Sequence, residues 1–280
     1  MKFGLFAINQ NECITGDGLT RVARHAEEAG FESLWAGEHV VLPDPRVPPS
    51  PMNPGDAMGE PLIALSFAAA CTKRLLLGTG IIILPQRNPL VLAKQIATLD
   101  ALSGGRFILG VGVGYLEPEF RALGIPFDNK GPRTDDYLAA MRAVWYQENP
   151  SHQGRFTSFS GINAYPKPVR IPIVVGGRTP GAYKRAVEQG HGWYGFALDP
   201  EGTAESLAGL KAAAEKYTRP PELGPLEISV TPRGLPDLEA TKRFADLGVS
   251  RLILLPGRAR TAAEYCALID GVASTLAGKV

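Results

Sequence analysis

Short apolar segments alternate with helical segments along the whole chain, and this alternation restricts the possible folds more than any other feature. Eight segments are predicted as strands: residues 2–8, 33–37, 75–83, 106–112, 173–176, 192–197, 226–230 and 251–255. Most are rich in Val, Ile and Leu on consecutive positions, which is typical of parallel strands covered on both faces. Strands that alternate with helices indicate βαβ units. Eight such units favour a closed α/β barrel, the (β/α)8 TIM barrel, over an open doubly wound sheet.

The predicted helices have recognisable ends. Asp17 is expected to cap the first helix, whose apolar stripe runs toward a stop at Gly30. Asn88-Pro89 opens a helix over residues 90–102, and Gly104 follows its end. The chain has 280 residues, of which 45% are hydrophobic. This is enough for one large core, so a single domain over residues 1–280 is expected.

Two segments interrupt the alternation. Residues 43–61 contain seven prolines and follow the second strand, so they are expected to form a long loop on the catalytic face, with a lid as one possible role. Residues 147–172, before the fifth strand, are also rich in Gly and Pro. Within them residues 155–159 suggest a short hairpin with a structural role.

Composition narrows the class of partner. Lys and Arg number 29 against 28 Asp and Glu, so the chain lacks the excess positive charge typical of nucleic-acid binding or of anionic membrane binding. A small molecule is the expected partner. The three cysteines are far apart and form no Cys-x-x-Cys motif, which argues against disulfides or zinc and favours the cytoplasm. No apolar run approaches the ~20 residues that span a bilayer.

In α/β barrels the active site is built at the C-terminal ends of the strands, and few polar side chains are expected there. Of the four histidines, His39 alone follows a strand end, which makes it the candidate acid/base group. The alternative is a histidine that merely bonds a loop. Neighbouring residues of a strand point to opposite sides, so Glu38 shares the site with His39 only if the chain has already turned into the loop.

Two glycine-rich segments are candidates for cofactor contacts. Gly176-Gly177-Arg178-Thr179 joins a strand to a helix start, where free N–H groups and an arginine suit a phosphate, although many turns need glycine for tightness alone. Glycine alternates with valine over residues 110–114, which either lets a flat ring approach or relieves crowding inside the barrel.

Other barrel chemistries lack their residues. No His-x-His ends a predicted strand, no lysine stands at a strand end, and there is no Gly-x-Ser-x-Gly. These absences argue against a metal-dependent hydrolase, a Schiff-base aldolase and a serine hydrolase. A phosphosugar isomerase or epimerase stays open, because it needs only a base and a phosphate cradle.

The chain resembles the luciferase-like monooxygenase superfamily, and within it the oxidoreductases that use the deazaflavin coenzyme F420. The matching stretches are residues 27–40 (EEAGFESLWAGEHV), 78–81 (GTGI), 84–89 (LPQRNP), 99–114 (LDALSGGRFILGVGVG) and 175–177 (VGG). The resemblance covers nearly the whole chain, and these stretches are specific as a set. The resemblance implies a barrel, a cofactor ring at the strand C-termini and a homodimer.

The resemblance also implies roles for individual residues. Glu38-His39 takes the place of an acidic-His pair that is Asp-His in many relatives, and the longer Glu38 side chain puts its carboxylate one methylene further out. Thr79-Gly80-Ile81 matches a bulge that often holds a non-prolyl cis peptide behind the ring. The segment from Gly112 through Gly114 to Glu117 matches the edge of the ring site. The turn Gly176 to Thr179 matches the phosphate contact.

These roles imply hydride transfer between F420 and a small organic substrate, with His39 moving the accompanying proton. The rival on the same scaffold is an FMN-dependent monooxygenase, because the same turn can hold the phosphate of FMN. The alternatives from other classes are a cofactor-free phosphosugar isomerase and a flavin-binding protein without catalytic activity.

Overall fold

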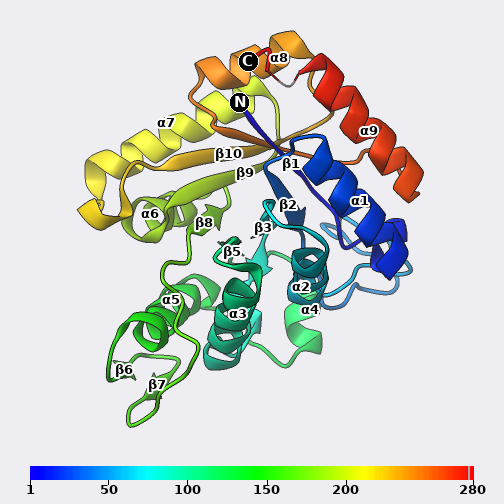
Figure 1. Cartoon of the computed structure of the whole chain (residues 1–280). Coiled ribbons are helices and arrows are strands. Elements are labelled where there is room, and N and C mark those ends of the chain that lie inside the picture. The colour runs from blue at the N-terminus through cyan, green and yellow to red at the C-terminus, as the bar shows by residue number, and fades with distance from the viewer. Residues whose placement is uncertain (277) are drawn as a thin grey trace.

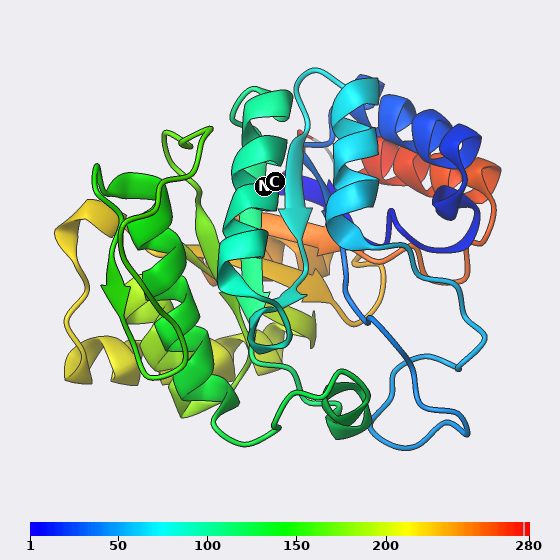
Figure 2. The same cartoon turned by 90° about the horizontal axis from the view of Figure 1, so that it is seen from below.

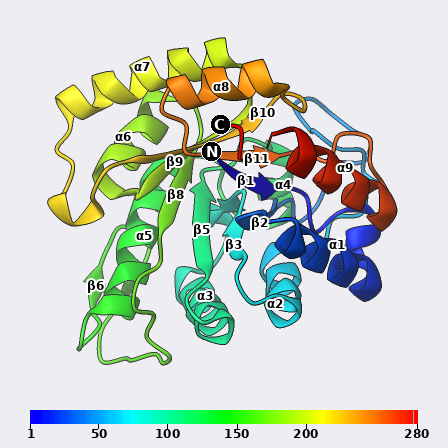
Figure 3. The same ribbon diagram turned by 45° about the horizontal axis from the view of Figure 1, so that its top comes forward.

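The computed structural model describes residues 1–276 and 278–280, and its main sheet is a closed ring of parallel strands. In ring order the strands are β1 (Lys2–Leu5), β2 (Ser33–Ala36), β3 (Leu76–Thr79), β5 (Phe107–Gly112), β8 (Ile173–Gly176), β9 (Gly192–Leu198), β10 (Glu227–Pro232) and β11 (Arg251–Leu254). The ring closes where β11 pairs with β1, and β4 (Ile82–Ile83) continues the third strand position along β5. Figure 3 shows this ring with the helices outside it, which confirms the predicted (β/α)8 barrel.

The helices cover the outside of the ring (Figure 1). They are α1 (Gly16–Glu28), α2 (Pro61–Cys71), α3 (Pro89–Ser103), α4 (Glu117–Ala122), α5 (Lys130–Tyr146), α6 (Pro180–Gln189), α7 (Pro200–Lys216), α8 (Leu238–Asp246) and α9 (Ala262–Thr275), with 3-10 turns η1 (Asn11–Ile14), η2 (Leu84–Gln86) and η3 (Pro221–Leu223). The short helix α4 is an addition to the regular alternation. It follows β5 and therefore lies at the C-terminal face of the barrel.

Helix ends follow the expected side chains with one correction. Asn88 caps α3 by accepting hydrogen bonds from two backbone N–H groups, and the helix ends at Gly104 in the left-handed conformation, as expected. The prediction that Asp17 caps α1 is wrong. The cap is Thr15, whose hydroxyl accepts from the Gly18 N–H at 3.1 Å, because the chain turns into the helix two residues earlier. Asp17 lies in the first turn, where its charge favours the positive end of the helix dipole.

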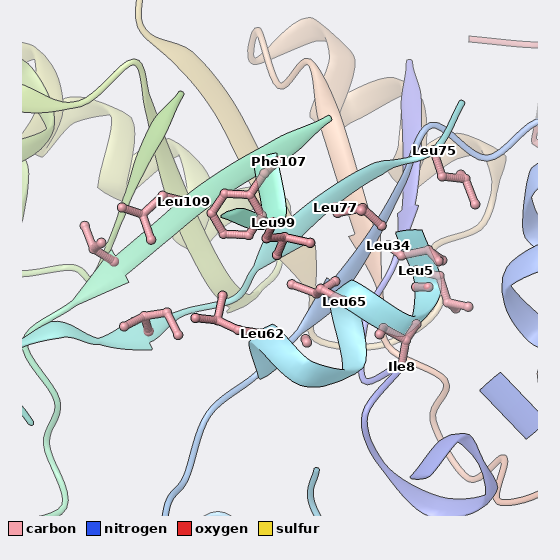
Figure 4. Close-up of a cluster of buried hydrophobic side chains, with 14 of the residues drawn as sticks. Leu5, Ile8, Leu34, Leu62, Leu65, Leu75, Leu77, Leu99, Phe107 and Leu109 are labelled. Atoms are coloured by element: carbon pink, nitrogen blue, oxygen red, sulfur yellow. The ribbon is translucent and has the colours of Figure 1, made fainter. Parts of the chain in front are cut away.

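The main hydrophobic core lies between the barrel wall and the helices. Figure 4 shows Leu62 and Leu65 of α2 among leucines from β2, β3 and β5. A smaller cluster fills the inside of the barrel, where the rings of Trp35 and Tyr194 stack with centroids 5.9 Å apart. The barrel is therefore a packed core, and a ligand has room only at its end.

An ionic cluster closes the N-terminal end of the barrel. The Arg251 side chain is 2% exposed and its guanidinium donates to both oxygens of Glu32 at 2.7 and 2.6 Å. A further contact of 3.1 Å joins it to Glu227, and Ser229 accepts from it at 3.1 Å. This cluster pairs the charged side chains at the N-terminal ends of the strands. The N-terminal end of the barrel therefore contributes to stability.

Both interruptions of the alternation are visible in the structure. Residues 37–60 form the loop after β2 without a helix or strand. Within residues 147–172 the strands β6 (His152–Gln153) and β7 (Ser158–Phe159) pair as an antiparallel hairpin, slightly earlier than expected. Asp136 of α5 fastens this hairpin by accepting from the Phe156 and Thr157 N–H groups at 2.8 and 3.0 Å.

The two chain ends meet, as Figure 2 shows, and the Met1 amino group donates to the Val280 carbonyl at 2.9 Å. Among the helices in the described part of the chain, none combines the length and apolar character that crossing a bilayer requires.

Candidate active site

The first candidate residue, His39, lies just beyond the C-terminal end of β2 and is largely enclosed. Its side chain is 8% exposed. The Nδ1 atom lies 3.2 Å from Oε2 of Glu119 on α4, and the Tyr115 hydroxyl lies 3.4 Å from Nε2. The His39 backbone N–H points to the sulfur of Met58, at the end of the long loop after β2. The ring is thus held from two sides at the barrel mouth.

Glu38 and His39 point into different surroundings. The Glu38 carboxylate is buried, accepts from the Ile83 N–H at 2.5 Å and forms an ion pair with Arg87. Arg87 also contacts Glu60, the residue that caps α2, at 2.6 Å. Burial raises the pKa of Glu38, while the Arg87 guanidinium and the Ile83 N–H act against this rise. The structure therefore separates the expected acidic-His pair and ties Glu38 to the chain behind it.

The segment after β3 has the geometry that the resemblance implies. The peptide bond between Gly80 and Ile81 is cis. The Thr79 hydroxyl donates to the Gly110 carbonyl and accepts from the Gly110 N–H, both at 2.8 Å, so it replaces a rung of the ladder to β5. Ile81 then turns its side chain across the barrel end toward β5 and β8.

The glycines of β5 make room for the protein's own side chains. A Cβ on Gly112 would lie 2.6 Å from the end of Ile81, and one on Gly114 would lie 2.6 Å from Ile83 and 2.7 Å from Phe120. Of the two explanations open from sequence, relief of crowding is the one that this geometry supports. Glu117 is exposed at the start of α4. Direct contacts of these residues with a ring stay a prediction.

The turn after β8 is open to solvent and suits an anion. Gly177 adopts φ +118°, and the stretch from Gly177 to Gly181 is exposed. Thr179 caps α6 with a neutral hydroxyl, which accepts from the Ala182 N–H at 3.2 Å. The Arg178 side chain is 47% exposed, and its guanidinium makes only a long contact of 3.7 Å, with the Glu205 carboxylate.

The neighbouring helix provides a contrast. α7 is capped by the Asp199 carboxylate, whose pKa is lowered by the hydrogen bond that it accepts from the Gly202 N–H. This negative charge already compensates the N-terminus of α7. The N-terminus of α6 has only a hydroxyl as its cap, so its positive end is the one that suits an added negative charge.

Further groups at the C-terminal side fit a bound aromatic cofactor. Gln86 ends η2 with its amide buried and without a hydrogen-bond partner among the described residues, so it offers an NH₂ donor group and a carbonyl acceptor to a ligand. Phe196 is 48% exposed and its ring centroid lies 5.5 Å from that of Phe6. Two surface hollows lie elsewhere, one between α1 and α9 and one beside the end of α3. Neither contains any of these groups.

Sequence reasoning missed Glu119, Tyr115 and Arg87. Glu119 is 80 residues from His39 in the chain. It lies on a helix that has no counterpart in the regular βα alternation. A signal was present for Arg87, which belongs to one of the matching stretches, and for Tyr115, which lies in the segment from Gly112 to Glu117 after the fourth strand. Buried ion pairs between distant segments leave no periodic pattern in a sequence.

Comparisons with known proteins identify the family to which the chain belongs. The profile of the luciferase-like monooxygenases matches residues 1–237. An uncharacterized protein of Mycobacterium tuberculosis is 32% identical, with 99% of both chains covered. The F420-dependent glucose-6-phosphate dehydrogenase of Kineococcus radiotolerans is 32% identical over 181 residues, which are 62% of this chain and 51% of that protein.

A solved structure agrees in fold. The monooxygenase RslO1 of Streptomyces bottropensis superposes with a TM-score of 0.75 at 22% identity, covering 99% of this chain and 98% of its own. The sequence match over most of the chain and the shared barrel lead to one conclusion: this chain belongs to the luciferase-like monooxygenase family and is an enzyme of that family.

Proposed function

We propose that the chain is a coenzyme F420-dependent oxidoreductase that transfers a hydride between the deazaflavin and a small organic substrate. The observation that carries the proposal is the placement of His39. Its ring stands at the barrel mouth between Glu119 and Tyr115, on the same face as the Gly80–Ile81 bulge. The F420-dependent relative supports this cofactor over others.

The residues present fit such a cofactor. In this proposal the exposed turn from Gly177 to Thr179 holds the phosphate, with Arg178 alongside. The bulge at Ile81 backs the ring, and the free amide of Gln86 offers hydrogen bonds at its edge. Glu38 is proposed as a positioning residue, because its carboxylate holds the Ile83 N–H directly after the bulge.

The coenzyme supplies a ring carbon that gains or loses the hydride. The protein supplies orientation and one proton position. When an alcohol is oxidised, its carbon gives up the hydride and its hydroxyl proton passes to His39 Nε2; in the reverse direction Nε2 returns the proton to the carbonyl oxygen. Holding the reacting atoms in line at the barrel mouth lowers the activation barrier, because the entropy cost of ordering them is met on binding.

The second candidate is an FMN-dependent monooxygenase. The family name and the fold of RslO1 favour it. An FMN phosphate suits the same turn as the F420 phosphate. The two candidates differ in chemistry, because reduced FMN reacts with oxygen and the deazaflavin reacts poorly with it.

Parallel titrations of the purified protein with F420 and with FMN test the choice, followed by fluorescence. Micromolar binding of F420 with little binding of FMN supports the proposal, and the reverse preference replaces it with the monooxygenase. Binding of neither refutes both. His39→Ala is expected to bind F420 as the unchanged protein does and to lose roughly 10²-fold in turnover, the usual contribution of an acid/base group.

A homodimer is also proposed, and α2 supplies its surface. The exposed residues of this helix are Ile63, Phe67 and Ala70, so its whole outer stripe is apolar. Ile63 is 72% exposed, and Val91 of the adjacent α3 is 57% exposed. Contiguous apolar surface of this kind marks protein–protein contacts. Sedimentation should give a dimer that Phe67→Glu converts to monomer; a monomeric unchanged protein would refute the proposed dimer.

A cytoplasmic location stays a prediction.

A further inference from the structure

The surroundings of His39 determine more than its position, because they offer each ring nitrogen a different kind of group. Glu119 is buried on α4, with a side chain that is 0% exposed. Its Oε1 accepts from the Val40 N–H at 2.6 Å, which leaves Oε2 to face His39 Nδ1 at 3.2 Å. A carboxylate has acceptors and no donors. Nδ1 therefore has to supply the proton in this contact.

The other ring nitrogen meets a hydroxyl, which can donate or accept. The Tyr115 hydroxyl lies 3.4 Å from Nε2, and the two rings meet edge to face at 82°. Burial, and then the charge of Glu119, raise the pKa of Tyr115, so its hydroxyl keeps its proton. The Glu119 carboxylate can only accept, so a neutral ring carries its proton at Nδ1, and the Tyr115 hydroxyl is then the donor toward Nε2.

Packing fixes Glu119 in this place. Phe120, the next residue, is 0% exposed and packs against the end of β5, where a Cβ on Gly114 would come within 2.7 Å of its ring. The Phe120 ring also packs edge to face against the Phe127 ring, with the two ring centroids 5.2 Å apart. The short helix α4 is thus fastened to the barrel through Phe120, and Glu119 cannot follow the ring if the ring turns.

We infer that Glu119 is a positioning residue which holds neutral His39 in the Nδ1–H tautomer, so that the lone pair lies on Nε2, where the Tyr115 hydroxyl faces it at the barrel mouth. This inference rests on the proposed function for its catalytic consequence, because a base must carry its lone pair on the nitrogen that meets the substrate; a substrate hydroxyl would take the place of the Tyr115 contact. Replacing the orienting carboxylate of a serine-protease triad by an amide costs about 10⁴-fold in kcat through the wrong tautomer. Glu119 occupies an equivalent relation to His39.

The variant Glu119→Gln tests the inference without changing the shape of the side chain. The Val40 N–H requires an acceptor, so it binds the amide oxygen and turns the amide NH₂ toward Nδ1. His39 must then accept at Nδ1 and carry its proton at Nε2. The variant is expected to invert the tautomer, whereas loss of a purely structural contact would leave the ring in a mixture.

Long-range ¹H–¹⁵N spectra of the protein labelled at histidine nitrogen report the tautomer without cofactor. His39→Asn identifies the His39 signals among the four histidines. The Nδ1–H form is expected in the unchanged protein and in Tyr115→Phe, and the Nε2–H form in Glu119→Gln. Glu215→Gln, an exposed glutamate on α7, is the control with the same charge change.

An Nε2–H ring in the unchanged protein, or an Nδ1–H ring in Glu119→Gln, would overturn the inference. The first of these results needs only His39→Asn for the assignment of signals, so misfolding of Glu119→Gln cannot hide it. In F420-dependent turnover Glu119→Gln is expected to lower kcat by about 10²-fold or more while F420 binding persists. Failure of F420 to bind would refute the proposed function and leave the tautomer result standing.

Discussion

Arg87 neutralises a buried carboxylate, and its removal gives a stability change with a definite pH dependence. In Arg87→Met the Glu38 side chain, 1% exposed, keeps the Ile83 N–H and loses its cation. Breaking a buried pair costs about 3–5 kcal/mol when the remaining charge stays buried. The unpaired Glu38 carboxylate can lower this cost by taking up a proton.

Protonation limits the cost. The ordinary pKa of a glutamate is 4.5, and each pH unit above it adds about 1.4 kcal/mol to the free energy of neutralising the group. At pH 7 the loss in unfolding free energy is therefore limited to about 3 kcal/mol. Removing the cation raises the pKa of Glu38 in the folded state further above its unfolded value, so the folded variant binds the extra proton. The loss consequently shrinks as the pH falls, to less than about 1 kcal/mol at pH 5.

Urea unfolding of the variant and of the unchanged protein at pH 5, 6 and 7 measures this difference. Arg243→Met is the control, because Arg243 pairs with Glu201 on the surface and its loss is expected to change little at any of these pH values. A loss for Arg87→Met that is equal at pH 5 and pH 7 would show that Glu38 is not the group responsible. A negligible loss at pH 7 would show that Arg87 does not neutralise a buried charge.

Three further predictions concern stability. Burial and then nearby arginines lower the pKa of His191 to about 4, below its ordinary 6.5, so the folded protein loses stability as the pH falls from 6.5 toward 4. Between pH 7 and pH 5 the unfolding free energy of the unchanged protein should therefore fall by about 1–2 kcal/mol more than that of His191→Gln, with partial exposure of the ring taken into account. Urea unfolding at the two pH values measures this difference. Gly110→Ala places a Cβ 1.8 Å from a backbone oxygen of β3 and should cost about 3 kcal/mol or more, whereas Gly112→Ala meets the movable end of an isoleucine and should cost about 1 kcal/mol; equal melting temperatures would contradict this. Arg251→Met should cost up to about 3 kcal/mol in urea unfolding, because Glu32, which is 23% exposed, loses its guanidinium; no loss would show that the cluster is dispensable.

The sequence allowed most of the fold to be predicted because the information is local. Strands covered on both faces have consecutive apolar residues, and helices between them begin at side chains such as Asn88 and Thr179 that can bind free N–H groups. The cap of α1 was misassigned because Thr15 and Asp17 are both suitable caps. The choice between them depends on where the preceding turn η1 ends, which a local pattern does not contain.

The sequence by itself determined the order of the barrel, the position of His39 at a strand end and the glycine turn after β8. Tertiary structure decided which groups meet there: Glu119 with His39, Arg87 with Glu38, and Ile81 with the glycines of β5. The physical reason is range. Backbone conformation and apolar periodicity depend on neighbours in the chain, whereas the partner of a buried charge depends on which strands and helices close around it.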